Sequence, residues 1–364
     1  MGNISEIYIN LEPILDVTSA GVKNYTISFV EELKLKPVSL LGFVDDRYFD
    51  LADTPLNEDA IQTALQNGDY LDYAKIANDN IVAIYFSPRS KDKQFKYEVE
   101  VVHDLGILLC SEFHERGMVK KLSPVIHKSL AQNDLIFTVS DSTKYQVDTY
   151  FHSLDVDSVT IGCASYLGNV SEPTINEPFR PYLLILGTVE PRKNHQLIFE
   201  MIKQYPEVLE SYDFIIAGKF GWGKTITQIA HDKGIDISKF AEKISYINEI
   251  TESEKSLLIR NASATIYPSF YEGFGMPVLE SIALGTPVIC SLSSSLVEAS
   301  GGLGFYFDPF SSDELFQQLH KLESMPSESV NRLLESMSEF SKRQTWESIV
   351  ERAMHELSII VGES

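Results

Sequence analysis

The sequence is poor in cysteine and has no long apolar run. Its three cysteines, Cys110, Cys163 and Cys290, are far apart in 364 residues, and each stands in an apolar stretch. This spacing favours buried, reduced thiols over a disulfide framework or a metal site. Because no apolar run approaches the roughly 18 residues that cross a membrane, no transmembrane helix is expected.

Positive charge is also scarce, with 30 Lys and Arg against 52 Asp and Glu and a net charge of -22. The acidic excess is spread over both halves of the chain, so nucleic-acid binding is not expected. The opening residues MGNISEIYIN lack the basic and apolar parts of a secretion signal. We therefore expect a cytoplasmic protein, whose oligomeric state the sequence does not set.

One stretch, residues 117–128, departs from this acidic character. Lys120, Lys121 and Lys128 alternate there with apolar residues. The pattern favours a solvated helix face. The alternative is a patch that touches anionic lipid at the inner face of the membrane, or an anionic acceptor.

Short β-branched or aromatic runs alternate with helical patterns in two successive arrays. The runs of the first array lie at 6–12, 80–87, 98–105, 135–140 and 158–162, and those of the second at 182–189, 214–218, 243–247, 264–269, 287–291 and 305–308. Continuous apolar strands of this kind are typical of parallel sheets covered on both faces. A proline-rich stretch without periodicity, 165–181, separates the arrays and predicts an interdomain linker.

These arrays predict an α/β protein with two doubly wound, Rossmann-like domains that face a central cleft. The domains are expected at 1–172 and 173–345, followed by an amphipathic helix over 346–364. Ligands of such sheets bind beyond the carboxyl ends of the strands, so the polar residues that follow each run are the candidates for a site.

The block YEGFGMPVLESIALGTPVI, at 271–289, contains a predicted helix from about residue 276 to 284. Pro277 suits the first turn of a helix and Gly285 suits its end. Gly275 would leave the backbone N–H groups of 275, Met276 and Val278 open to an anion, and the helix dipole would add partial positive charge. This helix start is therefore a candidate phosphate site.

Two carboxylates flank that helix start. Glu272 precedes the helix and Glu280 lies within it. Carboxylates accept hydrogen bonds from sugar and ribose hydroxyls, so the pair indicates a ligand with hydroxyl groups as well as phosphate. The alternative, favoured for an isolated pair, is that both are solvated or stabilise the helix.

Three further places follow predicted strands. Arg192 and Lys193 lie between a strand and the start of a helix near Asn194, where the dipole would repel them unless an anion lies between. His103 follows a strand of the first array and would face the cleft, and Gly21 lies in the first strand-to-helix turn, where it permits close backbone approach.

Residues 218–225, GKFGWGKT, match the phosphate-cradling loop of NTP-hydrolysing proteins. The segment follows a predicted strand and precedes a predicted helix, as such a loop should. An NTPase also needs an acidic residue at the end of a second strand to hold magnesium. Within the same predicted domain only FYFD ends in this way, and Pro309 follows it at once.

Together these motifs resemble the retaining glycosyltransferases of the GT-B fold, in the large family four that includes many mannosyl- and glucosyltransferases. The most specific element is E-x7-E from Glu272 to Glu280, followed by GTPVI and FYFDP, with EPRKN and a strand-end HD in the expected order. The sequence departs from the family in three places, where Ala20, Asn248 and Val297 replace a usual glycine, glycine and proline.

The resemblance implies roles for individual residues. Glu272 is expected to contact the hydroxyls of the donor sugar, Glu280 the ribose, and Arg192 with Lys193 the diphosphate. His103 is expected beside the donor sugar, and Gly218 and Lys219 along the nucleotide cleft. The resemblance implies neither a metal nor another cofactor, and it implies that the helix from residue 346 crosses back onto the N-terminal domain.

The implied activity is hexosyl transfer with retention, in which the departing diphosphate helps to take the proton of the acceptor hydroxyl. EPRKN and AGKFGWG resemble bacterial transferases of surface polysaccharide assembly, which implies GDP-mannose as donor and a glycan or lipid-linked glycan as acceptor. UDP-glucose, UDP-GlcNAc and dTDP-rhamnose are the alternative donors. Outside this class, an NTPase and a non-catalytic sugar-nucleotide sensor on the same fold are the alternatives.

Overall fold

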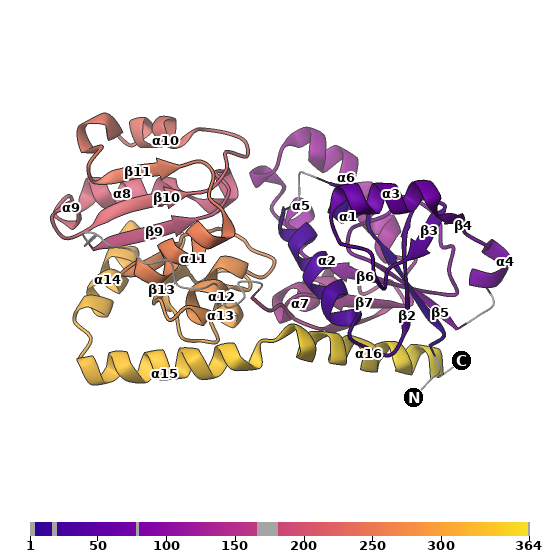
Figure 1. Cartoon of the computed structure of the whole chain (residues 1–364). Coiled ribbons are helices and arrows are strands. Elements are labelled where there is room, and N and C mark those ends of the chain that lie inside the picture. The colour runs from indigo at the N-terminus through magenta and orange to yellow at the C-terminus, as the bar shows by residue number, and fades with distance from the viewer. Residues whose placement is uncertain (1–3, 17–19, 78–79, 166–180, 363–364) are drawn as a thin grey trace. The chain divides into compact units, whose positions relative to one another are not determined.

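The computed structural model describes residues 4–16, 20–77, 80–165 and 181–362 and divides the chain into two compact units (Figure 1). Unit 1 comprises Met1–Leu108, Gly117–Tyr166 and Gln344–Ser364, and unit 2 comprises Leu109–Arg116 and Leu167–Arg343. The boundary predicted at 172 and nearly all of the predicted linker lie outside the described residues. The grouping of 109–116 with unit 2 has no counterpart in the predicted domains.

Unit 1 is built on an eight-stranded sheet in the order β4-β3-β2-β1-β5-β6-β7-β8. Its strands are β1 (Glu6–Asn10), β2 (Ser39–Val44), β3 (Arg47–Asp50), β4 (Asp69–Tyr70), β5 (Ile81–Tyr85), β6 (Tyr97–Val102), β7 (Leu135–Thr138) and β8 (Asp157–Thr160). All neighbours pair in parallel except β2 with β3 and β3 with β4. The sequence predicted the five strands β1, β5, β6, β7 and β8 and missed the other three.

The described helices of unit 1 lie mostly between these strands. They are α1 (Glu12–Leu15), α2 (Ala20–Leu33), α3 (Glu58–Asn67), α4 (Tyr73–Ile76), α6 (Arg116–Leu130), α7 (Asp141–Tyr150) and α16 (Trp346–Gly362). A short helix α5 (Gly106–Leu109) precedes α6 in the chain, and between them lies the 3₁₀ turn η1 (Ser111–Phe113), which is grouped with unit 2. Side-chain caps mark several starts, such as Ser140, whose hydroxyl accepts from the Thr143 N–H ahead of α7.

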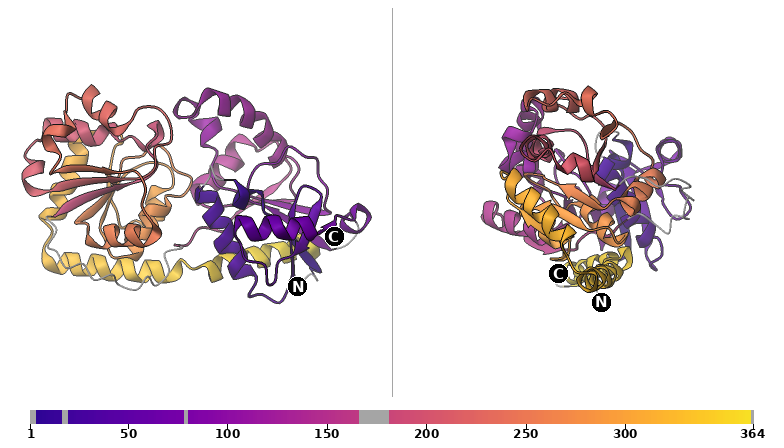
Figure 2. Two further views of the ribbon diagram at one scale, coloured as in Figure 1. Left: turned by 45° about the horizontal axis from the view of Figure 1, so that its top comes forward. Right: turned by 90° about the vertical axis from the view of Figure 1, so that its left-hand side faces the viewer.

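Unit 2 is a six-stranded, all-parallel sheet in the order β11-β10-β9-β12-β13-β14 (Figure 2). Its strands are β9 (Tyr182–Leu186), β10 (Asp213–Ala217), β11 (Ile244–Ile247), β12 (Ala264–Tyr267), β13 (Val288–Ser291) and β14 (Phe305–Phe307). All six were predicted from the sequence, because each is a short apolar run bounded by polar residues.

Helices cover both faces of this sheet. They are α8 (Gln196–Gln204), α9 (Val208–Ser211), α10 (Ile226–Asp232), α11 (Glu252–Asn261), α12 (Met276–Ala283), α13 (Leu296–Ala299), α14 (Ser312–Glu323) and α15 (Ser327–Arg343), with 3₁₀ turns η2 (Pro191–Lys193) and η3 (Ile237–Phe240). Alternate residues of β9 enter different cores: Leu183 packs with the α8 side chains, and Leu184 packs with those of α12. Burial on both faces explains why β9 is apolar throughout.

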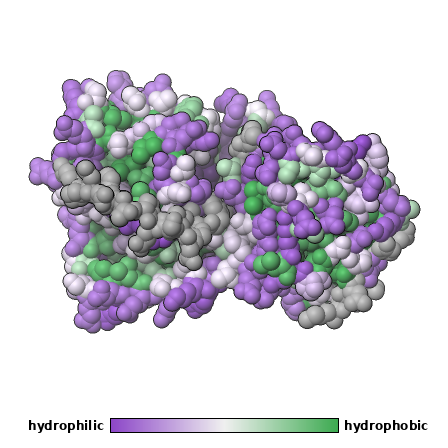
Figure 3. All heavy atoms as spheres, viewed as in Figure 1, coloured by the Kyte–Doolittle hydropathy of each residue, from purple (hydrophilic) through white to green (hydrophobic). Residues whose placement is uncertain are grey.

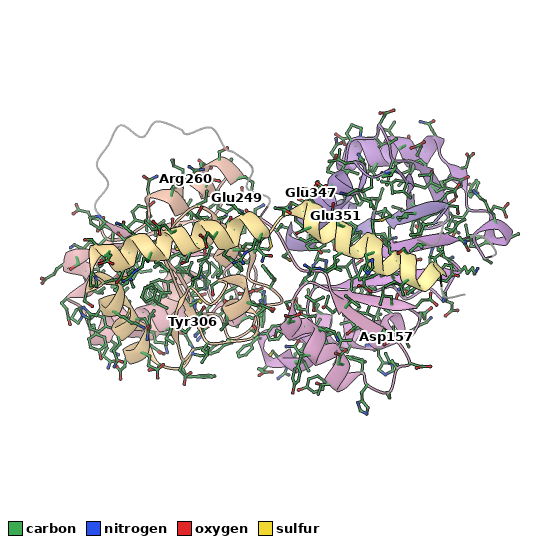
Figure 4. All side chains as sticks on the ribbon, turned by 90° about the horizontal axis from the view of Figure 1, so that it is seen from below. Asp157, Glu249, Arg260, Tyr306, Glu347 and Glu351 are labelled. Atoms are coloured by element: carbon green, nitrogen blue, oxygen red, sulfur yellow. The ribbon has the colours of Figure 1, made fainter. Side chains whose placement is uncertain are left out.

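The final helix, α16, belongs to unit 1 and packs along α2. The Arg352 guanidinium donates to the carbonyl oxygens of Thr160 and Ile161, both at 3.2 Å. Glu351 pairs with Lys36 of the segment after α2, at 3.6 Å; Figure 4 looks onto this helix and labels Glu351. These contacts attach α16 to the end of β8 and to the segment that follows α2.

The cysteines agree with the sequence-based expectation for two positions. None of the three forms a disulfide; Cys163 and Cys290 are buried, whereas Cys110 is partly exposed.

Hydrophilic side chains predominate on the face drawn in Figure 3. Among the described residues, no helix is long and apolar enough to cross a membrane.

Two glutamates of β6 lie inside unit 1. Glu98 and Glu100 are 0% and 1% exposed. The Arg89 guanidinium lies between them, 2.5 Å from Glu98 Oε2 and 3.4 Å from Glu100 Oε2, and its Nη1 also donates to Asn133 Oδ1 at 2.9 Å. Burial raises the pKa of Glu100, and the hydrogen bond from Ser129 counteracts this. The two carboxylates therefore depend on one buried cation.

Arg89→Met is expected to lower the free energy of unfolding by about 3–5 kcal/mol, because it leaves two buried carboxylates without a cation. Glu100→Gln, which keeps the shape and removes one charge, should cost only about 1 kcal/mol. Urea denaturation at pH 7 measures both values. Equal losses in the two variants would contradict a central role for Arg89.

Candidate active site

The order in which strands are added to the sheet of unit 2 reverses between β9 and β12. Strands β10 and β11 lie on one side of β9, and the chain then continues on the other side with β12, β13 and β14. In sheets of this order, ligands bind beyond the carboxyl ends of the two strands at the change. The loop after β9 carries Arg192 and Lys193, and the loop after β12 carries Glu272.

The loop after β9 has a defined conformation. Pro191–Lys193 form a 3₁₀ turn, and Asn194 then takes the left-handed conformation with φ 54°. The Asn194 side-chain amide donates to the carbonyl oxygens of Pro268, at 3.0 Å, and Pro309, at 2.8 Å. One buried asparagine thus ties this loop to the loops after β12 and β14, and α8 begins only at Gln196 rather than near Asn194.

Arg192, Lys193 and Glu272 form one ionic cluster. Lys193 Nζ lies 2.7 Å from Glu272 Oε1, and Arg192 Nη1 lies 2.8 Å from Glu272 Oε2. Arg192 also donates to the Tyr271 carbonyl and to Glu190 Oε1, both at 2.7 Å. From the sequence, the two cations near the start of a helix required an anion between them and the helix. In the structure, the anion that faces them is the carboxylate of Glu272.

Glu272 is ionised in spite of its burial. Its residue is 8% exposed. Burial alone would raise the pKa of Glu272, but the charges of Lys193 and Arg192 outweigh this and lower the pKa from 4.5 to about 2. The backbone of Glu272 is held as well, because its N–H donates to Ser294 Oγ at 2.8 Å and its carbonyl accepts from Ser295 Oγ at 3.0 Å.

The helix after Glu272 begins where the sequence predicted. Gly275 precedes α12 with φ 98°, and a Cβ there would lie 2.6 Å from Leu296 Cδ2, so both the conformation and the space require glycine. Met276 and Pro277 form its first turn. The expectation of an open N–H at Val278 is wrong, because that group donates to the Gly275 carbonyl at 2.9 Å.

Glu280 takes part in a different ion pair. It lies within α12 and is 0% exposed. Lys255 of α11 donates to Glu280 Oε1 at 3.0 Å and also pairs with Glu252 at 2.7 Å. The E-x7-E motif therefore places its two carboxylates in separate pairs with separate cations. The sequence gave no signal for Lys255, because the pairing spans 25 residues and depends on how α11 packs.

Gly218 is required by packing. A Cβ at this position would lie 2.0 Å from the Gly187 carbonyl oxygen, so the ends of β9 and β10 approach too closely for any side chain. Lys219 is exposed and lies 3.4 Å from Glu249. Asn248, which stands where the family usually has glycine, accepts hydrogen bonds from the Phe220 N–H and the Tyr246 hydroxyl, at 3.1 and 3.0 Å. These contacts join the loops after β10 and β11.

The last residues of GKFGWGKT cap and stabilise the helix that follows them. Lys224 pairs with Asp232 of α10 at 2.6 Å. The Thr225 hydroxyl accepts from the Gln228 N–H, and the Gln228 side chain accepts from the Thr225 N–H, which forms a capping box. Both residues that would hold a nucleotide and its metal in an NTPase are thus used to begin and stabilise α10.

Two predicted site residues lie in unit 1. His103 directly follows β6, and within the described residues its Nε2 has no hydrogen-bond partner. Burial lowers the pKa of His103 to about 4, with a partial offset from Asp104 and the backbone of Phe86. Gly21 was expected in a turn, but it is the second residue of α2, where a Cβ would meet nothing within 4 Å.

Comparison with known proteins finds relatives with named activities and a family model that matches part of the chain. O-antigen chain mannosyltransferase B of Escherichia coli is 28% identical over 273 residues, which cover 72% of this chain and 70% of the relative. O-antigen chain mannosyltransferase RfbU of Salmonella typhimurium is 28% identical over 192 residues, which cover 52% and 51%. Residues 172–344 match the family model of glycosyl transferases group 1. The family model, the named relatives and the fold together support a group 1 glycosyltransferase.

The chain has the same fold as a solved structure of another protein. Sucrose-phosphate synthase from Thermosynechococcus elongatus superposes with a TM-score of 0.71 over 99% of this chain and 100% of that one, at 17% identity. At this identity the likeness concerns the fold alone, which is GT-B. The family match covers residues 172–343 of unit 2, and with them both loops of the ionic cluster.

The pairing in the cluster predicts the pH dependence of stability. A carboxyl group whose pKa is lower in the folded than in the unfolded protein stabilises the fold at any pH above its unfolded-state pKa. This stabilisation is lost as the pH falls toward the folded-state pKa. Glu272 should therefore contribute about 3 kcal/mol at pH 7, and the contribution should disappear between about pH 4.5 and pH 2. In Glu272→Gln, urea titrations from pH 7 to pH 2 should show a flatter curve than in wild type. Parallel curves would contradict the ion pairs.

Proposed function

We propose that this glycosyltransferase transfers mannose from GDP-mannose to a glycan or lipid-linked glycan acceptor in the assembly of a surface polysaccharide. The observation that carries the proposal is the Arg192–Lys193–Glu272 cluster at the β9–β12 switch of unit 2. It offers cations for a diphosphate and an ionised carboxylate for sugar hydroxyls in one place. The printed names of two relatives, both O-antigen chain mannosyltransferases, support the choice of sugar and pathway.

Lys193 and Arg192 bind the diphosphate in this proposal. An ammonium group has three N–H donors, and the hydrogen bond to Glu272 uses one of them. The remaining donors can hold phosphate oxygens while the carboxylate fixes the direction of the side chain. Charge accumulates on these oxygens as the bond to the sugar breaks, so cations fixed in advance stabilise the transition state more than the ground state.

Glu272 acts as an acceptor for the sugar hydroxyls. Since its pKa is about 2, it carries no proton at neutral pH and cannot serve as a general acid. We assign Glu280 to the ribose hydroxyls, with Lys255 holding its carboxylate. The family resemblance implies a role beside the donor sugar for His103, whose pKa of about 4 leaves the imidazole uncharged at neutral pH.

The reaction proceeds with retention at the anomeric carbon. The acceptor oxygen bonds to the anomeric carbon while the bond from that carbon to the diphosphate oxygen breaks. The proton of the acceptor hydroxyl passes to the departing diphosphate on the same face. No protein base is required for this step, which agrees with a carboxylate that is already committed to two cations.

Other sugar-nucleotide donors, and other classes of protein, can be distinguished from this proposal by binding and turnover assays. UDP-glucose, UDP-GlcNAc and dTDP-rhamnose keep the same diphosphate chemistry and differ in the base and sugar. An NTPase would use Lys224 and Thr225, which α10 already engages. A non-catalytic sensor would bind the donor without turnover.

GDP-mannose should raise the melting temperature more than the other three sugar nucleotides, with about 2.7 kcal/mol of stabilisation at a hundred times the Kd. Lys193→Ala and Glu280→Ala should each lower kcat/KM at least about a hundredfold. Lys224→Ala is the matched control and should keep wild-type turnover. Stabilisation by ATP-Mg alone, together with loss of activity in Lys224→Ala, would refute the proposal.

We further propose that the enzyme works at the cytoplasmic face of the membrane and touches anionic lipid through α6. Lys120 and Lys121 are exposed there beside Met118, which is 47% exposed. Lys128 is directed elsewhere, because it pairs with Asp92 at 2.8 Å and donates to the Ser90 carbonyl at 2.7 Å. The proposed lipid contact therefore uses Lys120 and Lys121, and not the third lysine of the stretch named from the sequence.

Lys120→Glu combined with Lys121→Glu should reduce co-sedimentation with vesicles that contain phosphatidylglycerol. The binding free energy should weaken by at least roughly 2 kcal/mol, because two positive charges are lost near the anionic surface and two negative charges are added. Lys144→Glu is the control, since Lys144 of α7 is an exposed lysine paired within its own helix. Equal binding by both variants would contradict a contact through α6.

A further inference from the structure

Three aromatic rings lie edge to face in unit 1, and they lead from the last helix to the candidate catalytic histidine. The centroid of the Tyr25 ring lies 4.9 Å from that of His103, at an interplanar angle of 89°. On another side it lies 5.0 Å from the Trp346 ring, at 79°. Edge-to-face pairs of this kind have a preferred geometry and stabilise it by about 0.5–1.5 kcal/mol.

Tyr25 is firmly held. It lies on α2, is 3% exposed and stacks on Phe29 at 6.3 Å. Its hydroxyl donates to the Gly162 carbonyl at 3.0 Å. Burial raises the pKa of Tyr25 well above 10, so the hydroxyl keeps the proton that it donates. The ring therefore presents a fixed edge to His103.

Two contacts set the direction of the His103 ring, namely a hydrogen bond with the backbone of Phe86 and the edge of the Tyr25 ring. Its Nε2 has no hydrogen-bond partner within the described residues of the chain. Tyr25 is the aromatic ring against which the imidazole packs, through α2 rather than through the strand that carries His103. The hydrogen bond with Phe86 fixes one ring nitrogen, and the plane of the imidazole, with the direction of Nε2, depends also on Tyr25, which lies 78 positions earlier.

Trp346 supports Tyr25 from the opposite end of the chain. It is the first residue of α16, and α15 ends at Arg343. Arg352 of α16 donates to the carbonyls of Thr160 and Ile161, directly before the Gly162 carbonyl that accepts from Tyr25. Consequently α2 and α16 are both attached to residues 160–162, which fixes the two rings relative to one another.

We propose that Tyr25 is a positioning residue that orients His103 for sugar transfer, and that α16 holds it in place through Trp346. This inference rests on the role of His103 in the proposed function. A misplaced imidazole would affect the chemical step more than donor binding, because small displacements of a reacting group weaken transition-state interactions steeply.

Tyr25→Leu should lower kcat about tenfold or more and leave the KM for the donor within about twofold. Tyr25→Phe, which keeps the ring and loses the hydroxyl, should restore most of kcat. Trp346→Leu should act in the same direction as Tyr25→Leu, and it keeps the test valid if Tyr25→Leu does not fold. The imidazole Cε1–H resonance of His103 should shift in both leucine variants.

Phe43→Leu is the matched control, because Phe43 is a buried aromatic residue of the same unit whose ring packs on Tyr8 and Tyr85. It should lower thermal stability and leave kcat unchanged. If Tyr25→Leu loses stability to the same extent but keeps kcat, the positioning role is overturned.

His103→Ala separates this inference from the function on which it rests. Full activity in His103→Ala would remove the assigned role of the histidine, and the positioning role with it. Loss of activity in His103→Ala, together with wild-type kcat and an unshifted His103 resonance in Tyr25→Leu and Trp346→Leu, would overturn the positioning role alone.

Discussion

The ionic contacts of Glu272 determine the architecture of the site in unit 2. One carboxylate joins two cations from the loop of a neighbouring strand, at 2.7 and 2.8 Å. None of the three charges is stable in so buried a place without the others, since removing one partner leaves an uncompensated charge. The three side chains therefore have fixed directions before any substrate binds, which is the condition under which electrostatic stabilisation is most effective.

Much of the fold was predictable because unit 2 is a regular parallel sheet. Each of its strands is short, apolar and buried on both faces, and such runs are the clearest signal in a sequence. The strands missed in unit 1 have weaker patterns: β3 (RYFD) is polar, and β4 has only two residues. The run that contains EVEVV, in β6, was predicted as a strand, but nothing in the sequence indicated that both of its glutamates are buried around Arg89.

The sequence predicted which residues belong to the site, but it did not predict which of them contact one another. Motif spacing and the family resemblance named Arg192, Lys193, Glu272 and Glu280, but the pairing of Glu272 with both cations spans about 80 residues. Lys255 and Asn194 had no local signal, because their partners come from other loops. Gly218 was named as a donor contact, whereas the structure shows that the Gly187 carbonyl excludes any larger residue there.

The discontinuity of unit 1 has a consequence for biosynthesis. Unit 1 contains three separate stretches of the chain, and the last is α16. Domains generally fold in the order in which they leave the ribosome. Here unit 2 has all of its segments once residue 343 has emerged, while unit 1 still lacks the helix that packs on α2 and Tyr25. The N-terminal unit is thus the last to be completed, and the aromatic face around Tyr25 stays accessible to chaperones until α16 has left the ribosome.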